Sequence, residues 1–232
     1  MKNLTNKILF LLISVLLFSC SRNEEDATTT PSNSQFFNLN IGNKWIYKKY
    51  ENSTNNPNQF VFSGIVDTVK IVGIENIQGF TFAKKSSKKV NINNGIAQPI
   101  TFSYVRINSL GHLIEITDIN NVTNLTETYG LVIHPINDYN YIYNREINNG
   151  NGEVLGNLKF KLYSTENIIV EGNNYNVIPY NGIFTPSINH PELVSKTVEY
   201  NYSQNIGLIR YVCHSLVGNY TWEERLVSYQ IN

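Results

Sequence analysis

Cysteine is scarce in this chain of 232 residues, which contains only Cys20 and Cys213. If Cys20 serves another purpose, Cys213 has no partner within the chain and no intrachain disulfide can form. Proline is also infrequent, with 7 residues, and methionine occurs once. The fold is therefore expected to be held by side-chain packing and hydrogen bonds.

Charge of either sign is low, with 18 basic residues against 18 acidic ones. Removal of residues 1–19, which contain Lys2 and Lys7, would leave 16 basic and 18 acidic residues, a net charge of −2. No basic patch runs along the sequence, and nucleic-acid binding requires one. We therefore expect no nucleic acid among the partners.

The common catalytic signatures are missing from the sequence. It contains no His-Glu-x-x-His, no Gly-x-Ser-x-Gly, no phosphate-binding Gly-rich loop and no Cys-x-x-Cys. The pair Cys213-His214 combines a thiol with an imidazole, but neighbouring residues of a strand point to opposite faces. We interpret it as a buried thiol beside a surface histidine.

Two polar segments are also better explained by structure than by chemistry. Glycosidases need two carboxylates across a sugar, but a chain with 18 acids offers pairs such as Glu223-Glu224 by chance. Residues 148–153 carry oxygens that could contact Ca²⁺, yet they lack the several carboxylates of a tight site and read as a hairpin loop. We expect no catalytic residue, no metal, no cofactor and no enzymatic activity.

One hydrophobic run is present, at residues 8–18, and it follows Lys2 and Lys7. It is too short to span a bilayer, which needs ~20 apolar residues, and has the form of an export signal. Leu17-Phe18-Ser19-Cys20 then resembles the lipobox of bacterial lipoproteins, although Phe18 replaces the small residue that is usual there. The resemblance implies that residues 1–19 are a signal peptide and that Cys20 carries acyl chains such as palmitate.

Residues 20–35 are expected to be a flexible tether, because they are polar and cannot bury a core. Acyl chains on Cys20 would make the outer membrane a partner of the protein. The acidic cluster Glu24-Glu25-Asp26 resembles the export signal of surface-exposed lipoproteins in Bacteroidota. That resemblance implies display on the cell surface, with the periplasmic face as the alternative.

Residues 36–232 alternate between apolar and polar positions, as half-buried strands do. Examples are residues 42–50, with Trp45 and Tyr47 on one face, and residues 153–162. Four Asn-Gly dipeptides, at 94–95, 149–150, 151–152 and 181–182, indicate tight turns. The pattern predicts an all-β fold: a single antiparallel domain built as a curved sheet, a sandwich or an open half-barrel.

The start of this domain has the pattern Phe-x-Leu-x-x-Gly-Asn-x-Trp-x-Tyr at residues 37–47. It resembles the opening of many small Bacteroidota lipoproteins of unknown function, and residues 206–211 and 226–229 resemble their ending. The resemblance implies no activity. The residues themselves indicate a turn at Gly42-Asn43 and sheet packing for Trp45 and Tyr47.

The most suggestive site is the row Tyr139, Tyr141, Tyr143 and Arg145. On one strand, alternate residues share a face, and such a row could stack sugars or grip an extended peptide. The alternative is that the tyrosines cover the core while Arg145 reaches solvent at its end.

Three functions remain open from the sequence. The first is a non-enzymatic binding or structural lipoprotein of the cell envelope, whose partner would be a glycan, a peptide or a protein. The second is a lipid or lipoprotein carrier or docking protein with an open half-barrel, and the third is a hydrolase. An exposed tyrosine face would favour the first, a continuous apolar cavity the second, and convergent carboxylates or histidines the third.

Overall fold

The computed structural model describes residues 36–53, 56–216 and 218–232. These residues belong to one compact unit that spans 33–232. The expected signal peptide (1–19) and tether (20–35) lie outside the described residues, with Cys20 and the acidic cluster. Those assignments stay predictions.

The described residues form fourteen strands: β1 (Lys44–Ser53), β2 (Asn56–Ile77), β3 (Phe80–Asn91), β4 (Ile96–Ala97), β5 (Thr101–Ile107), β6 (Leu113–Ile116), β7 (Leu131–His134), β8 (Tyr143–Asn148), β9 (Val154–Leu162), β10 (Glu166–Val170), β11 (Asn173–Pro186), β12 (Lys196–Ser203), β13 (Gly207–His214) and β14 (Thr221–Gln230). Within these ranges no helix is long and apolar enough to cross a membrane.

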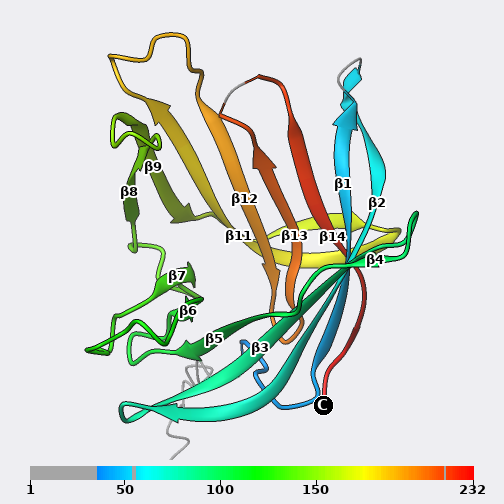
Figure 1. Ribbon diagram of the computed structural model, residues 1–232, viewed down its shortest axis with the longest axis vertical. Coiled ribbons are helices and arrows are strands. Elements are labelled where there is room, and N and C mark those ends of the chain that lie inside the picture. The colour runs from blue at the N-terminus through cyan, green and yellow to red at the C-terminus, as the bar shows by residue number, and fades with distance from the viewer. Residues whose placement is uncertain (1–35, 54–55, 217) are drawn as a thin grey trace, which may run out of the picture. The chain divides into compact units, whose positions relative to one another are not determined.

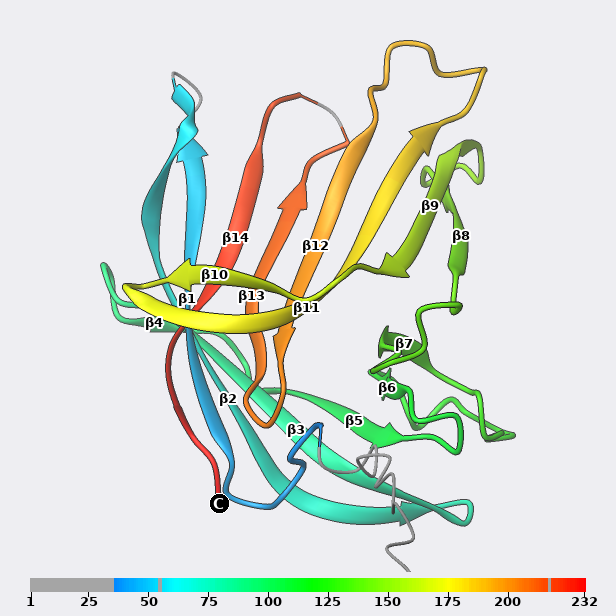
Figure 2. The ribbon, with the colours of Figure 1, turned by 180° about the vertical axis from the view of Figure 1, so that it is seen from behind.

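All fourteen strands belong to one antiparallel sheet. Its main order is β7-β6-β5-β3-β2-β1-β14-β13-β12-β11-β9-β8, and β4 and β10 pair with β3 and β11. The sheet bends round until it is nearly closed into a barrel, so that β5, β6 and β7 lie opposite the β8–β12 side (Figures 1 and 2). The prediction of a single all-β antiparallel domain is confirmed.

A hairpin covers part of the convex side of the sheet. The first half of β11 leaves the main sheet with β10, and the pair crosses in front of β1, β14 and β13 in the view of Figure 2. Val170, Tyr175 and Val177 of this hairpin are buried in the same apolar cluster as Ile209 of β13. The hairpin therefore forms a small second layer, which leaves the concave side of the sheet for the site described below.

A histidine joins the two sides of the curved sheet where they approach each other. His134, at the end of β7, is fully buried, and its Nε2 donates to the carbonyl of Ile178 in β11 at 3.2 Å. The backbone amide of Ile136 donates to Nδ1 at 2.9 Å, so the neutral ring carries its proton on Nε2. Burial, the largest influence, lowers the pKa of His134 to about 3.

Asparagine side chains fasten the start of the domain to its end. Asn43 is fully buried, and its Nδ2 donates to the carbonyl of Asn38 at 2.9 Å. Its Oδ1 accepts from the backbone amide of Asn232 at 2.8 Å. Gly42 precedes it with a φ of +94°, which confirms the expected turn. The Gly-Asn pair thus positions β1 before Trp45 enters the sheet.

Three of the four predicted Asn-Gly turns are confirmed. Residues 94–95 lie in the turn between β3 and β4, and residues 149–152 form the loop between β8 and β9. The fourth prediction was wrong, because Asn181 and Gly182 lie inside β11. A Cβ on Gly182 would lie 2.6 Å from the ring of Phe160, so the glycine is needed for packing instead of for a turn.

Candidate ligand-binding cavity

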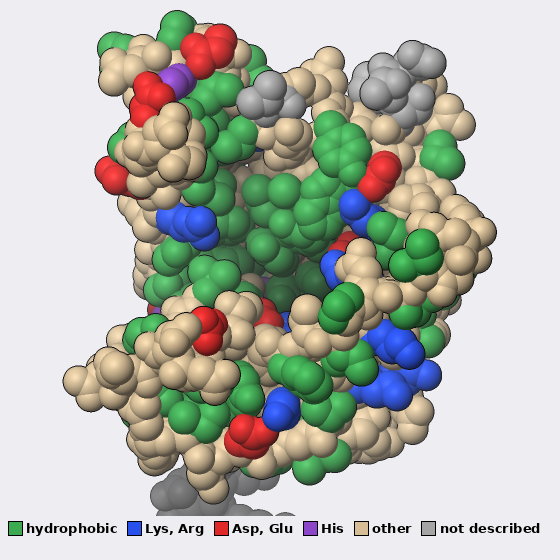
Figure 3. Space-filling view, in the orientation of Figure 1, with side chains coloured by type: hydrophobic (Ala, Val, Ile, Leu, Met, Phe, Trp, Pro, Cys, Tyr) green, Lys and Arg blue, Asp and Glu red, His purple; other side chains and the backbone are tan. Residues whose placement is uncertain are grey.

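The concave side of the sheet encloses a cavity of about 680 Å³. This volume lies within the range of ~300–1,000 Å³ that is typical of small-molecule sites. Every second residue of the inner strands points into it, such as Trp45 and Tyr47 of β1 and Asp67, Val69 and Ile71 of β2. Figure 3 shows that this face is hollowed, with hydrophobic side chains on its floor and charged ones around it.

One end of the cavity is mainly apolar. Trp45, Ile71, Val105 and Leu113 line it and are all buried, with exposed fractions between 2% and 8%. The Trp45 indole Nε1 donates to the carbonyl of Ile206 at 2.5 Å, so its polar atom has a partner. This end can therefore receive an apolar group without leaving the indole N–H unpaired.

Charged side chains lie in two places. Lys85 of β3 pairs with Glu115 of β6 at 2.5 Å beside the apolar residues, because Lys85 is in register with Ile71 and Glu115 is in register with Val105. The other end, called the charged end, carries Lys89 of β3, which lies 3.2 Å from Glu224 of β14 and 3.9 Å from Asp67 of β2. Three carboxylates and two ammonium groups thus line the cavity, with a net charge of −1.

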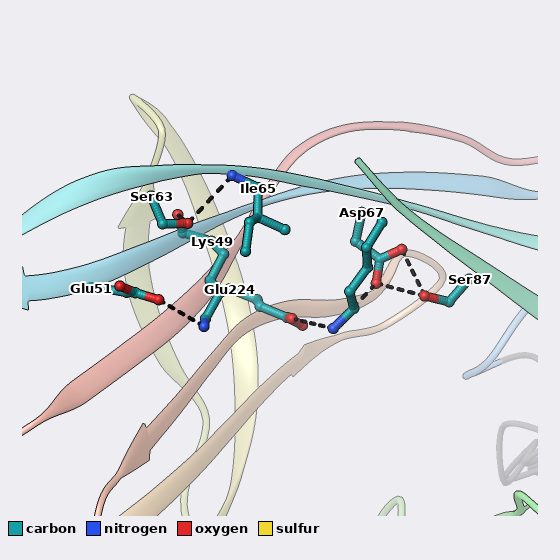
Figure 4. A network of polar contacts seen from close by, with 8 residues as sticks. Lys49, Glu51, Ser63, Ile65, Asp67, Ser87 and Glu224 are labelled. Carbon is teal, nitrogen blue, oxygen red and sulfur yellow. Dashed lines mark hydrogen bonds and ion pairs between the residues drawn. The ribbon is translucent and has the colours of Figure 1, made fainter. Parts of the chain in front are cut away.

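Hydroxyl groups hold two of these carboxylates in place. The Ser87 hydroxyl donates to Asp67, and its oxygen lies 2.7 Å from Oδ1 and 2.8 Å from Oδ2 of the carboxylate. The dashed lines in Figure 4 mark these contacts. Burial acts to raise the pKa of Glu115, but the charge of Lys85 and hydrogen bonds from Lys85 and Ser103 outweigh it. The pKa of Glu115 is therefore lowered, and the group is ionised at neutral pH.

Two buried tyrosines line the cavity close to its carboxylates. Burial, followed by the negative charges of Glu224 and Asp67, raises the pKa of Tyr47 well above its ordinary value. The Tyr47 hydroxyl donates to the carbonyl of Leu208 at 3.0 Å. Burial is also the largest influence that raises the pKa of Tyr202, and Glu115 adds to it. The carboxylates thus make this region unfavourable for a further negative charge.

Aromatic rings continue across the concave face beyond the charged end. Neighbouring ring centroids lie 4.8 Å apart for Trp222 and Tyr211, 4.6 Å for Tyr211 and Tyr200, and 6.0 Å for Tyr200 and Phe160. Tyr143 of β8 follows at 6.3 Å from Phe160. The rings come from five different strands and pack on one another, so they form an aromatic row across the sheet.

The predicted row at residues 139–145 is not a single strand face. Tyr139 lies in a turn and is 49% exposed, Tyr141 lies in the following loop, and β8 begins only at Tyr143. Tyr141 packs edge-on against buried His112 at 4.5 Å, and Arg145 is exposed on β8. The expectation of one shared face was wrong, because the turn interrupts the alternation. A binding role for these residues stays a prediction.

The other segments considered from the sequence are separated by the sheet. Glu224 faces the cavity, whereas Glu223 bonds Arg225 on the opposite face. Cys213 is a free, half-buried thiol. The neighbouring His214 is hydrogen-bonded through Nδ1 to the Thr221 hydroxyl at 2.9 Å. Among the described residues, no group of three or more His, Cys, Asp or Glu side chains is placed to hold a metal ion.

Sequence reasoning did not predict the charged lining of the cavity. The lining has five charged residues from four strands: Asp67, Lys85, Lys89, Glu115 and Glu224. The sequence did contain one signal. Asp67 alternates with Val69 and Ile71 along one strand, so it places a charged side chain on the same face as apolar ones. Such a residue needs a partner inside the fold.

No known protein family and no curated protein matches the chain. Two solved structures resemble it. One is a candidate lipoprotein from Parabacteroides distasonis ATCC 8503, with 13% identity and a TM-score of 0.45, covering 84% of this chain and 98% of that one. The other is a candidate exported protein with a YmcC-like fold from Bacteroides fragilis NCTC 9343, with 9% identity, a TM-score of 0.43 and the same coverages. Both TM-scores are below 0.5, so no property of these proteins is transferred to this chain.

Proposed function

We propose that this protein is a non-enzymatic lipoprotein of the cell envelope that binds a small amphiphile on its concave face. The observation that carries the proposal is the cavity of about 680 Å³, which is mainly apolar at one end and carries Asp67, Lys89 and Glu224 at the other. An apolar chain would lie against Trp45, Ile71 and Val105, and a polar head group would lie beside Lys89 and Glu224. The ligand is therefore closer to a lipid than to a glycan or a peptide.

Burial of the apolar chain would supply most of the affinity. Each methylene group taken out of water contributes about 0.8 kcal/mol, which corresponds to about a fourfold change in Kd. The buried floor of the cavity is already assembled, and its indole N–H is bonded to Ile206. Little reorganisation would oppose binding, which favours a preformed site.

A chain-length series tests this proposal. The protein is the mature chain, residues 20–232, carrying Cys20→Ala and made without residues 1–19, so that no detergent competes for the cavity. We expect decanol to bind up to about 15-fold more tightly than octanol in isothermal titration calorimetry, because two methylene groups are added. Equal affinities, or no binding of either alcohol, would contradict the proposal.

A pair of tryptophan substitutions provides the control. Val69 points into the cavity, and Thr68, its neighbour in β2, points to the opposite face. Val69→Trp is expected to fill the cavity and abolish decanol binding, whereas Thr68→Trp is expected to leave it unchanged. A circular-dichroism spectrum shows whether each variant is folded.

The envelope location rests on Cys20 and the hydrophobic run before it. Cys20→Ala in the full chain is expected to remove the acyl chains and with them the membrane fractionation of the protein. Intact mass spectrometry that finds Met1 uncut, or Cys20 unmodified, would contradict lipidation. Display on the cell surface predicts that neutralising Glu24, Glu25 and Asp26 together reduces cleavage by protease added to intact cells.

A glycan or an extended peptide at the tyrosine row is the less well supported ligand. Tyr139 and Tyr141 do not share a strand with Tyr143, so they do not offer successive rings along one strand. The rings that do form a row pack on their neighbours, as Tyr200 and Tyr211 do. Because these rings pack on one another, we interpret them as part of the wall of the concave face and not as a separate surface for stacking sugars.

A further inference from the structure

We propose that the cavity selects an amphiphile with a positively charged amine head group over one with an anionic head group. The inference rests on the proposed function and adds the chemistry of the ligand's polar end. It is carried by the arrangement of Asp67, Glu224 and Lys89 at the charged end of the cavity.

The carboxylates at this end are held by the fold, whereas one of the ammonium groups is not. Asp67 has only 9% of its side chain exposed and accepts from Ser87 with both oxygens. Glu224 has 17% exposed, and both acids contact the same ammonium group, that of Lys89. Lys89 is 39% exposed, the largest fraction among the five charged residues that line the cavity.

This difference gives an entering amine a place to bind. The long side chain of Lys89 can swing into solvent at little cost, because much of it is already in water. A ligand ammonium group could then take its position between Asp67 and Glu224 and form charge-assisted hydrogen bonds with both. The Lys85–Glu115 pair would stay in place, since Glu115 is also bonded to Ser103.

An anionic head group meets the opposite situation. It would enter a wall with three carboxylates and two ammonium groups, and both ammonium groups are already paired. To bind Lys89, it would have to displace Glu224 and leave that carboxylate half-buried without its partner, which is unfavourable. The negative charges of Glu224 and Asp67 already act on the nearby Tyr47 hydroxyl.

Three ligands with the same chain test the inference: decylamine, decanoate and decanol, titrated into the mature chain below the concentrations at which they form micelles. We expect decylamine to bind at least tenfold more tightly than decanoate, with decanol between them. Equal binding of decylamine and decanoate, together with binding of decanol, would overturn the head-group preference and leave the proposed function standing. Failure of all three to bind would overturn both.

Two substitutions with opposite expected effects place the preference at this site. Glu224→Gln is expected to weaken decylamine binding five- to tenfold and to leave decanol unchanged. Lys89→Gln is expected to tighten decylamine binding, because the two carboxylates lose their internal ammonium group. Lys89→Gln also weakens decanoate binding if the site is the one described.

Glu199→Gln is the matched control, because it removes one negative charge from the opposite face of β12, where Glu199 pairs with Arg210. It is expected to change none of the three affinities. If Glu199→Gln weakens decylamine binding as much as Glu224→Gln does, the preference comes from the charge of the whole protein and the site assignment is wrong. If Lys89→Gln weakens decylamine binding, the exchange of ammonium groups is wrong.

Discussion

The ring of Phe160 in β9 lies directly over Gly182 in the neighbouring strand β11. The two residues are paired in register, and a Cβ on Gly182 would lie 2.6 Å from two ring carbons of Phe160. The ring thereby reaches across β11 to Tyr200 in β12, at 6.0 Å between centroids. A residue without a side chain in the middle of a strand thus allows the aromatic row to continue across the sheet.

Gly182→Ala is expected to destabilise the protein by about 1–3 kcal/mol, because the added methyl group forces the Phe160 ring out of its position. Gly150→Ala is the control: Gly150 lies in the β8–β9 loop, and a Cβ there meets no atom within 4 Å. Its effect should stay within about 0.5 kcal/mol. Urea denaturation of both variants measures the difference, and equal stabilities would mean that the ring moves freely.

His134 is expected to make the protein sensitive to acid. Its pKa is about 3 in the folded state because of burial, whereas an unfolded histidine has a pKa near ~6.5. Between these values the unfolded state binds one more proton, so the free energy of unfolding falls as the pH is lowered from 6.5 towards 3. The loss from this group is about 2–3 kcal/mol between pH 7 and pH 4.5.

Urea denaturation at pH 7 and pH 4.5 tests this expectation. In His134→Phe the difference between the two pH values should shrink by about the same 2–3 kcal/mol, although the variant loses the bond to Ile178 and is less stable at pH 7. An unchanged pH difference would show that other groups cause the acid sensitivity.

Asn43→Ala is expected to cost about 1–3 kcal/mol of stability, because it leaves the backbone amide of Asn232 and the carbonyl of Asn38 without their partner. Asn173→Ala is the control, since Asn173 is exposed in the β10–β11 hairpin and its amide bonds only the nearby carbonyl of Glu171. Thermal unfolding distinguishes the two. A small effect of Asn43→Ala would mean that water replaces the side chain.

Tyr141→Ala decides between packing and ligand binding for the loop before β8. Tyr141 packs on buried His112, so its truncation is expected to lower the free energy of unfolding by about 1–3 kcal/mol. Tyr139→Ala should have an effect within about 0.5 kcal/mol, because this side chain is 49% exposed. If Tyr141→Ala instead leaves stability unchanged and removes retention on a cell-surface glycan, the binding row is supported.

The local alternation of the sequence was enough to predict strands and their class. Trp45 and Tyr47 were expected on one face, and both line the cavity. Asn94-Gly95 was expected to be a turn and is one. These features depend on neighbouring residues, because backbone geometry fixes side-chain direction over short distances.

The site could not be predicted in the same way, because it depends on which strands become neighbours. Lys85 and Glu115 are thirty residues apart and meet only because β5 lies between their strands. Asn181-Gly182 has the sequence of a turn, yet the ring of Phe160, from a different strand, decides its conformation. Alternation at residues 139–145 likewise gave no sign that a turn at Tyr139 interrupts it.

The sheet ends on two short strands. β7 has 4 residues and β8 has 6, while the longest strand, β2, lies well inside the order. Exposed backbone at the edge of a sheet can pair with another chain, and short edge strands offer few groups for such pairing. If the proposed lipid anchor concentrates the protein on a membrane, where copies would meet often, this arrangement would help neighbouring molecules to remain separate instead of joining edge to edge into fibrils.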